Sequence, residues 1–131
     1  ELNLGAQALR QAWLRCAFNV MARNCDDHTK NLAFIMEETG RWSLSPAYDM
    51  SFAHDPGPNK WTRQHQMRVN GKAQNITRAD LTSAARQFDV DGANRLLDGI
   101  AEVLRQWPRY ARGVGVPESE IARIAGLQQL A

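Results

Sequence analysis

Acidic and amide side chains that could hold a metal ion and move a proton gather in two short segments. The first segment contains Asp26, His28, Lys30 and Asn31, and the second contains Asp49. Carboxylate and amide oxygens are ligands that Mg²⁺ prefers, beside waters and phosphate oxygens. Asp26 and Asn31 lie five positions apart, as do the base and a metal-binding asparagine in the catalytic loop of protein kinases. The spacing therefore favours phosphoryl transfer, with Lys30 as a cation near the transferred phosphate.

A β-hairpin is predicted between the two segments. Short apolar runs at 32–36 and 41–45 flank the turn residue Gly40, a pattern typical of two antiparallel strands. A hairpin brings its two ends back to the same place, so we expect Asp49 to lie near Asn31. The sequence thus predicts a cluster of oxygen ligands at the open end of this hairpin.

Helices are predicted on both sides of this region. Apolar residues at helical spacing over 9–21 predict a first helix that is buried on most sides. An irregular stretch at 51–60 and a short strand at 66–71 are expected next. Three further helices are expected over 77–88, from after Gly92 to Tyr110, and over 118–127. Thr77 is predicted to cap the first of these, and Pro108 to end or kink the second.

Length and composition indicate one folded domain over residues 1–131, mainly α with small β-hairpins. The formal net charge is +2 and 44% of the residues are hydrophobic, which excludes a disordered chain. The sequence has no apolar run of about twenty residues and no signal peptide, so we expect a cytoplasmic protein without a membrane partner. Cys16 and Cys25 lack the spacing of a zinc site and are expected to be free thiols.

Three segments of the chain form a combined motif around the candidate site. They are Phe18-Asn19-Val20, Arg23-Asn24-Cys25-Asp26-Asp27-His28-Thr29-Lys30-Asn31 and Leu44-Ser45-Pro46-Ala47-Tyr48-Asp49-Met50. Together they resemble the HipA family, the serine/threonine kinase toxins of bacterial toxin-antitoxin modules. The similarity extends to the stretches 69–72 and 76–77 and to the helical tail, so it covers the whole chain. It implies a protein-kinase-like C-terminal lobe of the HipA type.

The resemblance also implies roles for the site residues. Asp26 matches the catalytic base, while Asn31 and Asp49 match the residues that hold magnesium. His28 would orient Asp26 or contact phosphate. The activity implied is transfer of the ATP γ-phosphate to a protein hydroxyl, possible substrates including an aminoacyl-tRNA synthetase. The implied partner is a HipB-like DNA-binding antitoxin, through which the protein would meet DNA and regulate transcription.

The sequence departs from ordinary protein kinases in ways that suit this family. Asn24 and Cys25 precede the base, where ordinary kinases have His-Arg, and Met50 follows the metal-binding aspartate in place of Phe. The only close pair of glycines lies at 113–115, in the helical tail, so no nucleotide-binding loop is found. The chain also begins without methionine. We therefore expect a fragment of a longer protein that has little or no kinase activity alone.

Two other functions stay open. One is a metal-dependent phosphohydrolase with Asp26, Asp27, His28 and Asp49 around the metal, which would need no second lobe. The other is a non-enzymatic regulatory module of a DNA-bound complex, in which the basic stretch 60–86 contacts the partner or DNA.

Three polar residues are expected to have structural roles. Adjacent side chains seldom point into one site, so Asp27 is expected to cap or support the loop. His54 and His65 lie in the irregular region and are interpreted as ordinary polar loop residues.

Overall fold

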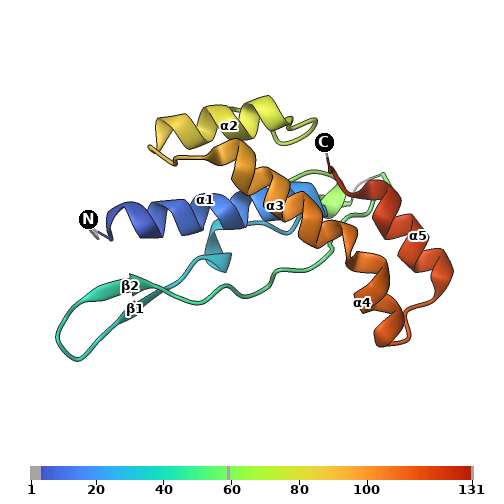
Figure 1. Cartoon of the computed structure of the whole chain (residues 1–131), viewed down its shortest axis with the longest axis horizontal. Helices are drawn as coiled ribbons and strands as arrows, with labels where there is room; N and C mark the ends of the chain where they lie inside the picture. Colours follow the sequence, from blue (N-terminus) through green and yellow to red (C-terminus); the bar gives the residue numbers. More distant parts are fainter. Residues whose placement is uncertain (1–3, 59, 131) are drawn as a thin grey trace.

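The computed structural model describes residues 4–58 and 60–130, and this part of the chain is mainly helical (Figure 1). It confirms the expected combination of helices with a small antiparallel hairpin. Two short 3₁₀ turns lie at Thr29–Asn31 and Trp61–Arg63. The main elements are α1 (Gly5–Ala22), β1 (Phe34–Met36), β2 (Trp42–Leu44), α2 (Arg78–Gln87), α3 (Ala93–Arg105), α4 (Trp107–Gly113) and α5 (Glu118–Leu127).

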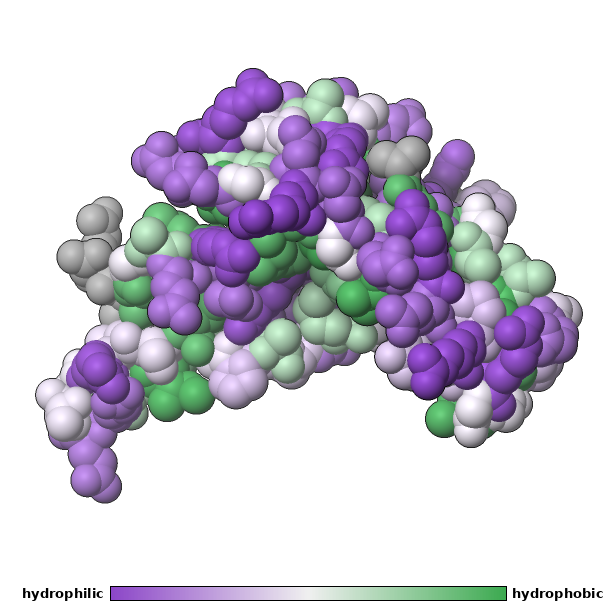
Figure 2. Space-filling model, viewed as in Figure 1, coloured by the Kyte–Doolittle hydropathy of each residue, from purple (hydrophilic) through white to green (hydrophobic). Residues whose placement is uncertain are grey.

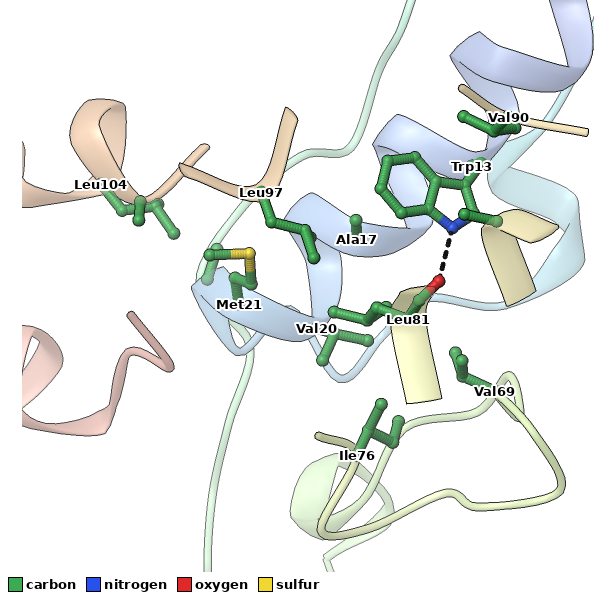
Figure 3. Close-up of a cluster of buried hydrophobic side chains, with 13 residues drawn as sticks. Trp13, Ala17, Val20, Met21, Val69, Ile76, Leu81, Val90, Leu97 and Leu104 are labelled. Carbon is green, nitrogen blue, oxygen red and sulfur yellow. Dashed lines mark hydrogen bonds between the residues drawn. The ribbon is translucent and has the colours of Figure 1, made fainter. Parts of the chain in front are cut away.

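The core lies where the second half of α1 meets α2 and α3. Ala17 on α1 and Leu97 on α3 are almost fully buried, because a small side chain on α1 lets α3 approach closely. The indole nitrogen of Trp13 donates a hydrogen bond to the carbonyl of Leu81 on α2, at 3.1 Å, so the one polar atom of this buried ring is satisfied. Figure 3 shows these side chains pointing toward one another from the three helices.

The first half of α1 differs from the expectation that this helix is buried on most sides. Leu9 is 49% exposed. It lines an open apolar groove together with Phe34 of the hairpin and Phe88 after α2, and Figure 2 shows apolar surface where the hairpin meets the start of α1. Within the described residues no element covers this face, so helical periodicity marked the apolar side of α1 but not how much of it is buried.

The hairpin forms as expected, with Phe34 paired to Leu44 and Met36 to Trp42. The strand expected at 66–71 is wrong. Its only ladder contact in the described structure is an isolated bridge between Val69 and Lys72. The backbone amides at 66 and 67 bond to a side chain instead of to a neighbouring strand, which is why alternating hydropathy here does not produce a strand.

The C-terminal helices follow their local signals. Thr77 forms a capping box with Asp80 at the start of α2, as predicted. The long helix expected to reach Tyr110 breaks at Gln106, and Pro108 lies in the first turn of α4, where a missing N–H costs nothing. In the part of the chain that the structure describes, no helix has the length and apolar character needed to cross a membrane.

Candidate functional site

The candidate site is the loop that leaves α1 and enters the hairpin. Its last turn is the 3₁₀ turn Thr29–Asn31. The backbone N–H of Asn31 closes this turn by donating to the His28 carbonyl at 3.0 Å. The side-chain Nδ2 of Asn31 donates to the backbone carbonyl of Asp26 at 2.9 Å. This bond fixes the amide, and its oxygen Oδ1 has no protein donor among the described residues. Asn31 therefore presents an acceptor of the kind that magnesium binds.

Asp26 and His28 form the second feature of the loop. The His28 Nε2 lies 3.5 Å from the Asp26 Oδ1. Neither this Oδ1 nor the His28 Nδ1 has a hydrogen-bond partner in the described residues, although both atoms are buried. A buried carboxylate oxygen without a donor is costly unless something completes it. The Asp26 carboxylate thus has an oxygen free to accept a hydrogen bond or a ligand, next to the His28 ring.

Asp49 is positioned by its backbone. The buried Asn24 donates through Nδ2 to the Asp49 carbonyl at 2.9 Å and to the side-chain oxygen of Asn19 at 3.0 Å. Asp49 has a φ of 55°, a left-handed conformation that aspartate adopts more readily than most other non-glycine residues. The exposed side chain is thus carried by a backbone held from α1.

The two ends of the hairpin do return to one place, as expected. The Tyr48 hydroxyl donates to the Lys30 carbonyl at 2.6 Å. The next residue, Asp49, is held by the hydrogen bond from the Asn24 side chain to its carbonyl. Lys30 itself is exposed, and its ammonium group has no ion-pair partner within residues 4–58 and 60–130. Its role at a phosphate stays a prediction.

Asp27 points away from this site and is buried. Its Oδ2 accepts a hydrogen bond from the His65 Nδ1 at 2.8 Å, and its Oδ1 accepts from the backbone amides of Gln66 and Met67 at 2.7 and 3.3 Å. The expectation that Asp27 supports the loop is confirmed. The interpretation of His65 as an ordinary loop residue is wrong, since the ring is only 3% exposed. No local pattern marked this pair, because the two residues lie 38 positions apart.

The histidines differ in charge because their surroundings differ. Burial by itself lowers the pKa of His65, but hydrogen bonds of the ring to Asp27 and to the thiol of Cys25 outweigh burial and raise the pKa to about 9. His65 is therefore a cation at neutral pH, paired with the Asp27 carboxylate. Burial and the nearby Arg23 lower the pKa of His54, whose ring lies 3.1 Å from that guanidinium. His54 is thus also more than a free loop residue.

The cysteines carry no disulfide, as expected. Cys16 and Cys25 are both free thiols. Burial, with a smaller contribution from the Asp27 charge, raises the pKa of Cys16 to about 11. Cys16 therefore stays protonated and behaves as a small apolar side chain.

A family model for the HipA-like C-terminal domain matches residues 2–126, almost the whole chain. The chain belongs to this family. No curated protein and no solved structure matched it. The match agrees with the resemblance carried by the loop motif, and the site described above is a loop of a HipA-like C-terminal domain.

The described residues of this HipA-like domain could bind magnesium through one or two oxygen ligands but not through a shell of several carboxylates. They contain no group of three His, Cys, Asp or Glu side chains that could hold a metal, so the four-residue shell considered for a phosphohydrolase does not form there. Asp27 is committed to His65 instead. Magnesium needs only one or two protein oxygens and completes its octahedron with water and phosphate. The free Oδ1 of Asn31 and the exposed carboxylate of Asp49 match that need.

The basic stretch 60–86 of the HipA-like domain is partly neutralised. Three of its cations pair with carboxylates, at nitrogen-to-oxygen distances of 2.7–3.6 Å. Such pairing reduces the positive field that binding to the DNA backbone requires. The pairs are Lys60 with Asp55, Lys72 with Asp80 and Arg78 with Asp98.

Proposed function

We propose that this HipA-like domain is the C-terminal lobe of a serine/threonine protein kinase of the toxin type. The observation that carries the proposal is the bond from the Asn31 side chain to the Asp26 carbonyl. It ties the proposed metal ligand to the backbone of the proposed base across one short loop, and in the described structure the Asp26 Oδ1 accepts no hydrogen bond. Phosphoryl transfer needs mainly such positioning and charge neutralisation.

Each residue of the loop has one task in this proposal. Asp26 accepts the proton of the substrate hydroxyl, and His28 orients its carboxylate. Asn31 and Asp49 hold the magnesium ion, which when bound neutralises charge on the phosphates of ATP. Lys30 contacts the transferred phosphate from the exposed edge of the loop.

The grip on ATP comes from a second lobe in this proposal. The 131 residues contain no glycine-rich phosphate loop, which a kinase requires. We also propose the partners that the family resemblance implies, a HipB-like DNA-binding antitoxin and a protein substrate such as an aminoacyl-tRNA synthetase. Contact with DNA then runs through the antitoxin.

The test is Mg²⁺-dependent phosphate transfer from ATP by the full-length protein that contains this domain. Asp26→Asn should lower kcat by about 10²- to 10⁴-fold, the usual contribution of a positioned base. Asn31→Ala and Asp49→Asn should raise the Mg²⁺ concentration needed for half-maximal activity. The exposed Asp91 gives a control, since Asp91→Asn makes the same chemical change far from the loop in sequence.

Equal transfer by the wild type and the Asp26→Asn variant would contradict the proposal. Hydrolysis of a phosphate ester by this domain alone, lost in Asp49→Ala, would favour the phosphohydrolase instead. Salt-sensitive binding of duplex DNA that Asp26→Asn leaves unchanged would favour the non-enzymatic module.

A further inference from the structure

The catalytic roles proposed above leave one buried charged pair unused. Asp27 and His65 are each 3% exposed and lie 2.8 Å apart. They join the loop after α1 to the irregular segment 65–67, which no other part of the proposed mechanism employs. Replacing a buried ion pair with apolar residues often leaves stability unchanged or improves it. Stability alone is therefore a poor reason for this pair to be present.

The pair links two segments of the chain through hydrogen bonds. One carboxylate, that of Asp27, accepts three hydrogen bonds, from the His65 ring and from the amides of Gln66 and Met67. The loop is thereby fastened to the segment 65–67 through the residue directly after Asp26. With both oxygens of Asp27 occupied, its side chain cannot turn toward the solvent.

The opposite side of the loop is fastened as well. The carbonyl of Asp26 accepts the bond from Asn31, so the Asp26–Asp27 peptide is held through this oxygen and through the side chain of Asp27. The two neighbouring carboxylates then point to different environments, since the Asp26 side chain is 28% exposed and that of Asp27 is 3% exposed.

We propose that Asp27 and His65 are positioning residues, whose buried ion pair clamps the segment 65–67 to the loop and sets the direction in which Asp26 presents its carboxylate. The inference rests on the proposed role of Asp26 as the base. Neither Asp27 nor His65 touches the substrate in this account. Their effect reaches the reaction only through the Asp26 backbone.

The test compares His65→Ala, His65→Asn and Asp27→Asn in the full-length protein. A base displaced by about 1 Å can cost on the order of 100-fold, so His65→Ala should lower kcat roughly 10- to 100-fold, with the KM for ATP changed less than about threefold. His65→Asn keeps a donor close to the position of Nδ1 and should recover part of the loss. Leu97→Ala in the core is the control for instability, and its kcat per folded molecule should equal that of the wild type.

A kcat per folded molecule in the His65 and Asp27 variants equal to that of the wild type would overturn the positioning role. Amide hydrogen exchange supplies a readout that does not need activity. In Asp27→Asn, exchange should accelerate at residues 26–31 and 65–67 and not in α3. If the wild-type protein transfers no phosphate, the kinase proposal is wrong. Faster exchange at these residues in Asp27→Asn would still support the clamp in that case. Unchanged exchange would sink the clamp.

Discussion

Single amide side chains do much of the positioning in this loop. The Asn31 side chain donates to the Asp26 carbonyl, and its oxygen stays free for a ligand. The Asn24 side chain donates two hydrogen bonds, to Asn19 and to the Asp49 carbonyl, and is 1% exposed. The sequence could predict the first of these, because Asp26 and Asn31 are close along the chain. It could not predict the second, because the acceptor that Asn24 finds at Asp49 lies 25 positions away.

Asn24→Ala should destabilise the domain by about 1–3 kcal/mol, since it removes two hydrogen bonds and leaves the buried oxygen of Asn19 without its donor. Urea unfolding measures the change. Asn94→Ala is the control, because Asn94 is exposed on α3 and its side chain only accepts one exposed hydrogen bond, from Arg78, so its loss should stay below about 1 kcal/mol. Equal losses in the two variants would show that the Asn19–Asn24 contact has no structural weight.

The charge of His65 makes stability depend on pH. Its pKa is about 9 in the folded protein, above the value of about 6.5 for an unfolded chain. The stabilisation that comes from the charge on His65 is therefore complete below about pH 6.5 and is lost as the pH rises through 9. The difference in unfolding free energy between the wild type and His65→Asn should shrink over that window.

His54 acts in a separate pH window. Burial and the nearby Arg23 lower the pKa of His54, so its contribution to folding stability is present above about pH 6.5 and falls as the pH drops below that value.

The groups that face His65 are Asp27, Cys25 and His54. A difference between the wild type and His65→Asn that stays constant from pH 6 to 10 would contradict the charged pair.

Among the elements, α2 has the most direct sequence signal. The Asp80 amide donates to the Thr77 hydroxyl at 3.3 Å, and the Thr77 amide donates to the Asp80 carboxylate at 2.8 Å. Thr77→Ala should cost about 1 kcal/mol of unfolding free energy in urea, because the helix loses its N-cap. Thr82→Ala on the same helix is the control and should cost less, since its hydroxyl caps nothing. The reverse order would contradict the capping role.

Elements defined by local chemistry were predictable, and elements defined by distant contacts were not. Pro108 marks a helix break through its own ring, and Thr77 marks a helix start through its hydroxyl and its backbone amide. The segment 66–71 alternates like a strand, but Asp27 takes its amides. Periodicity also found the apolar face of α1, yet whether Leu9 is covered depends on what packs there. In the first failure the deciding partner, Asp27, lies far away in the sequence, and in the second no described element covers the face.

At the scale of the whole molecule, the candidate site depends on the core beneath it. The loop begins directly after the buried end of α1. Val20 and Met21 of that end pack in the same cluster as Leu97 of α3. Hydrogen bonds fasten the loop to Asn19 of α1, to Ala53 and to the segment 65–67. Loss of the core should therefore release the loop.

Leu97→Ala should lower the unfolding free energy by about 2–5 kcal/mol, because it leaves a cavity at a side chain that is 1% exposed. Val103→Ala is the control on the same helix, since Val103 is 55% exposed and should change stability by less than about 0.5 kcal/mol. The NMR signal of the Trp13 indole N–H reports the core, and the NMR signals of the His65 ring report the clamp. In urea both signals should move to the same lower midpoint in Leu97→Ala, with the slope of the transition unchanged. A His65 signal that kept its wild-type midpoint while the Trp13 midpoint fell would show that the loop is held independently of the core.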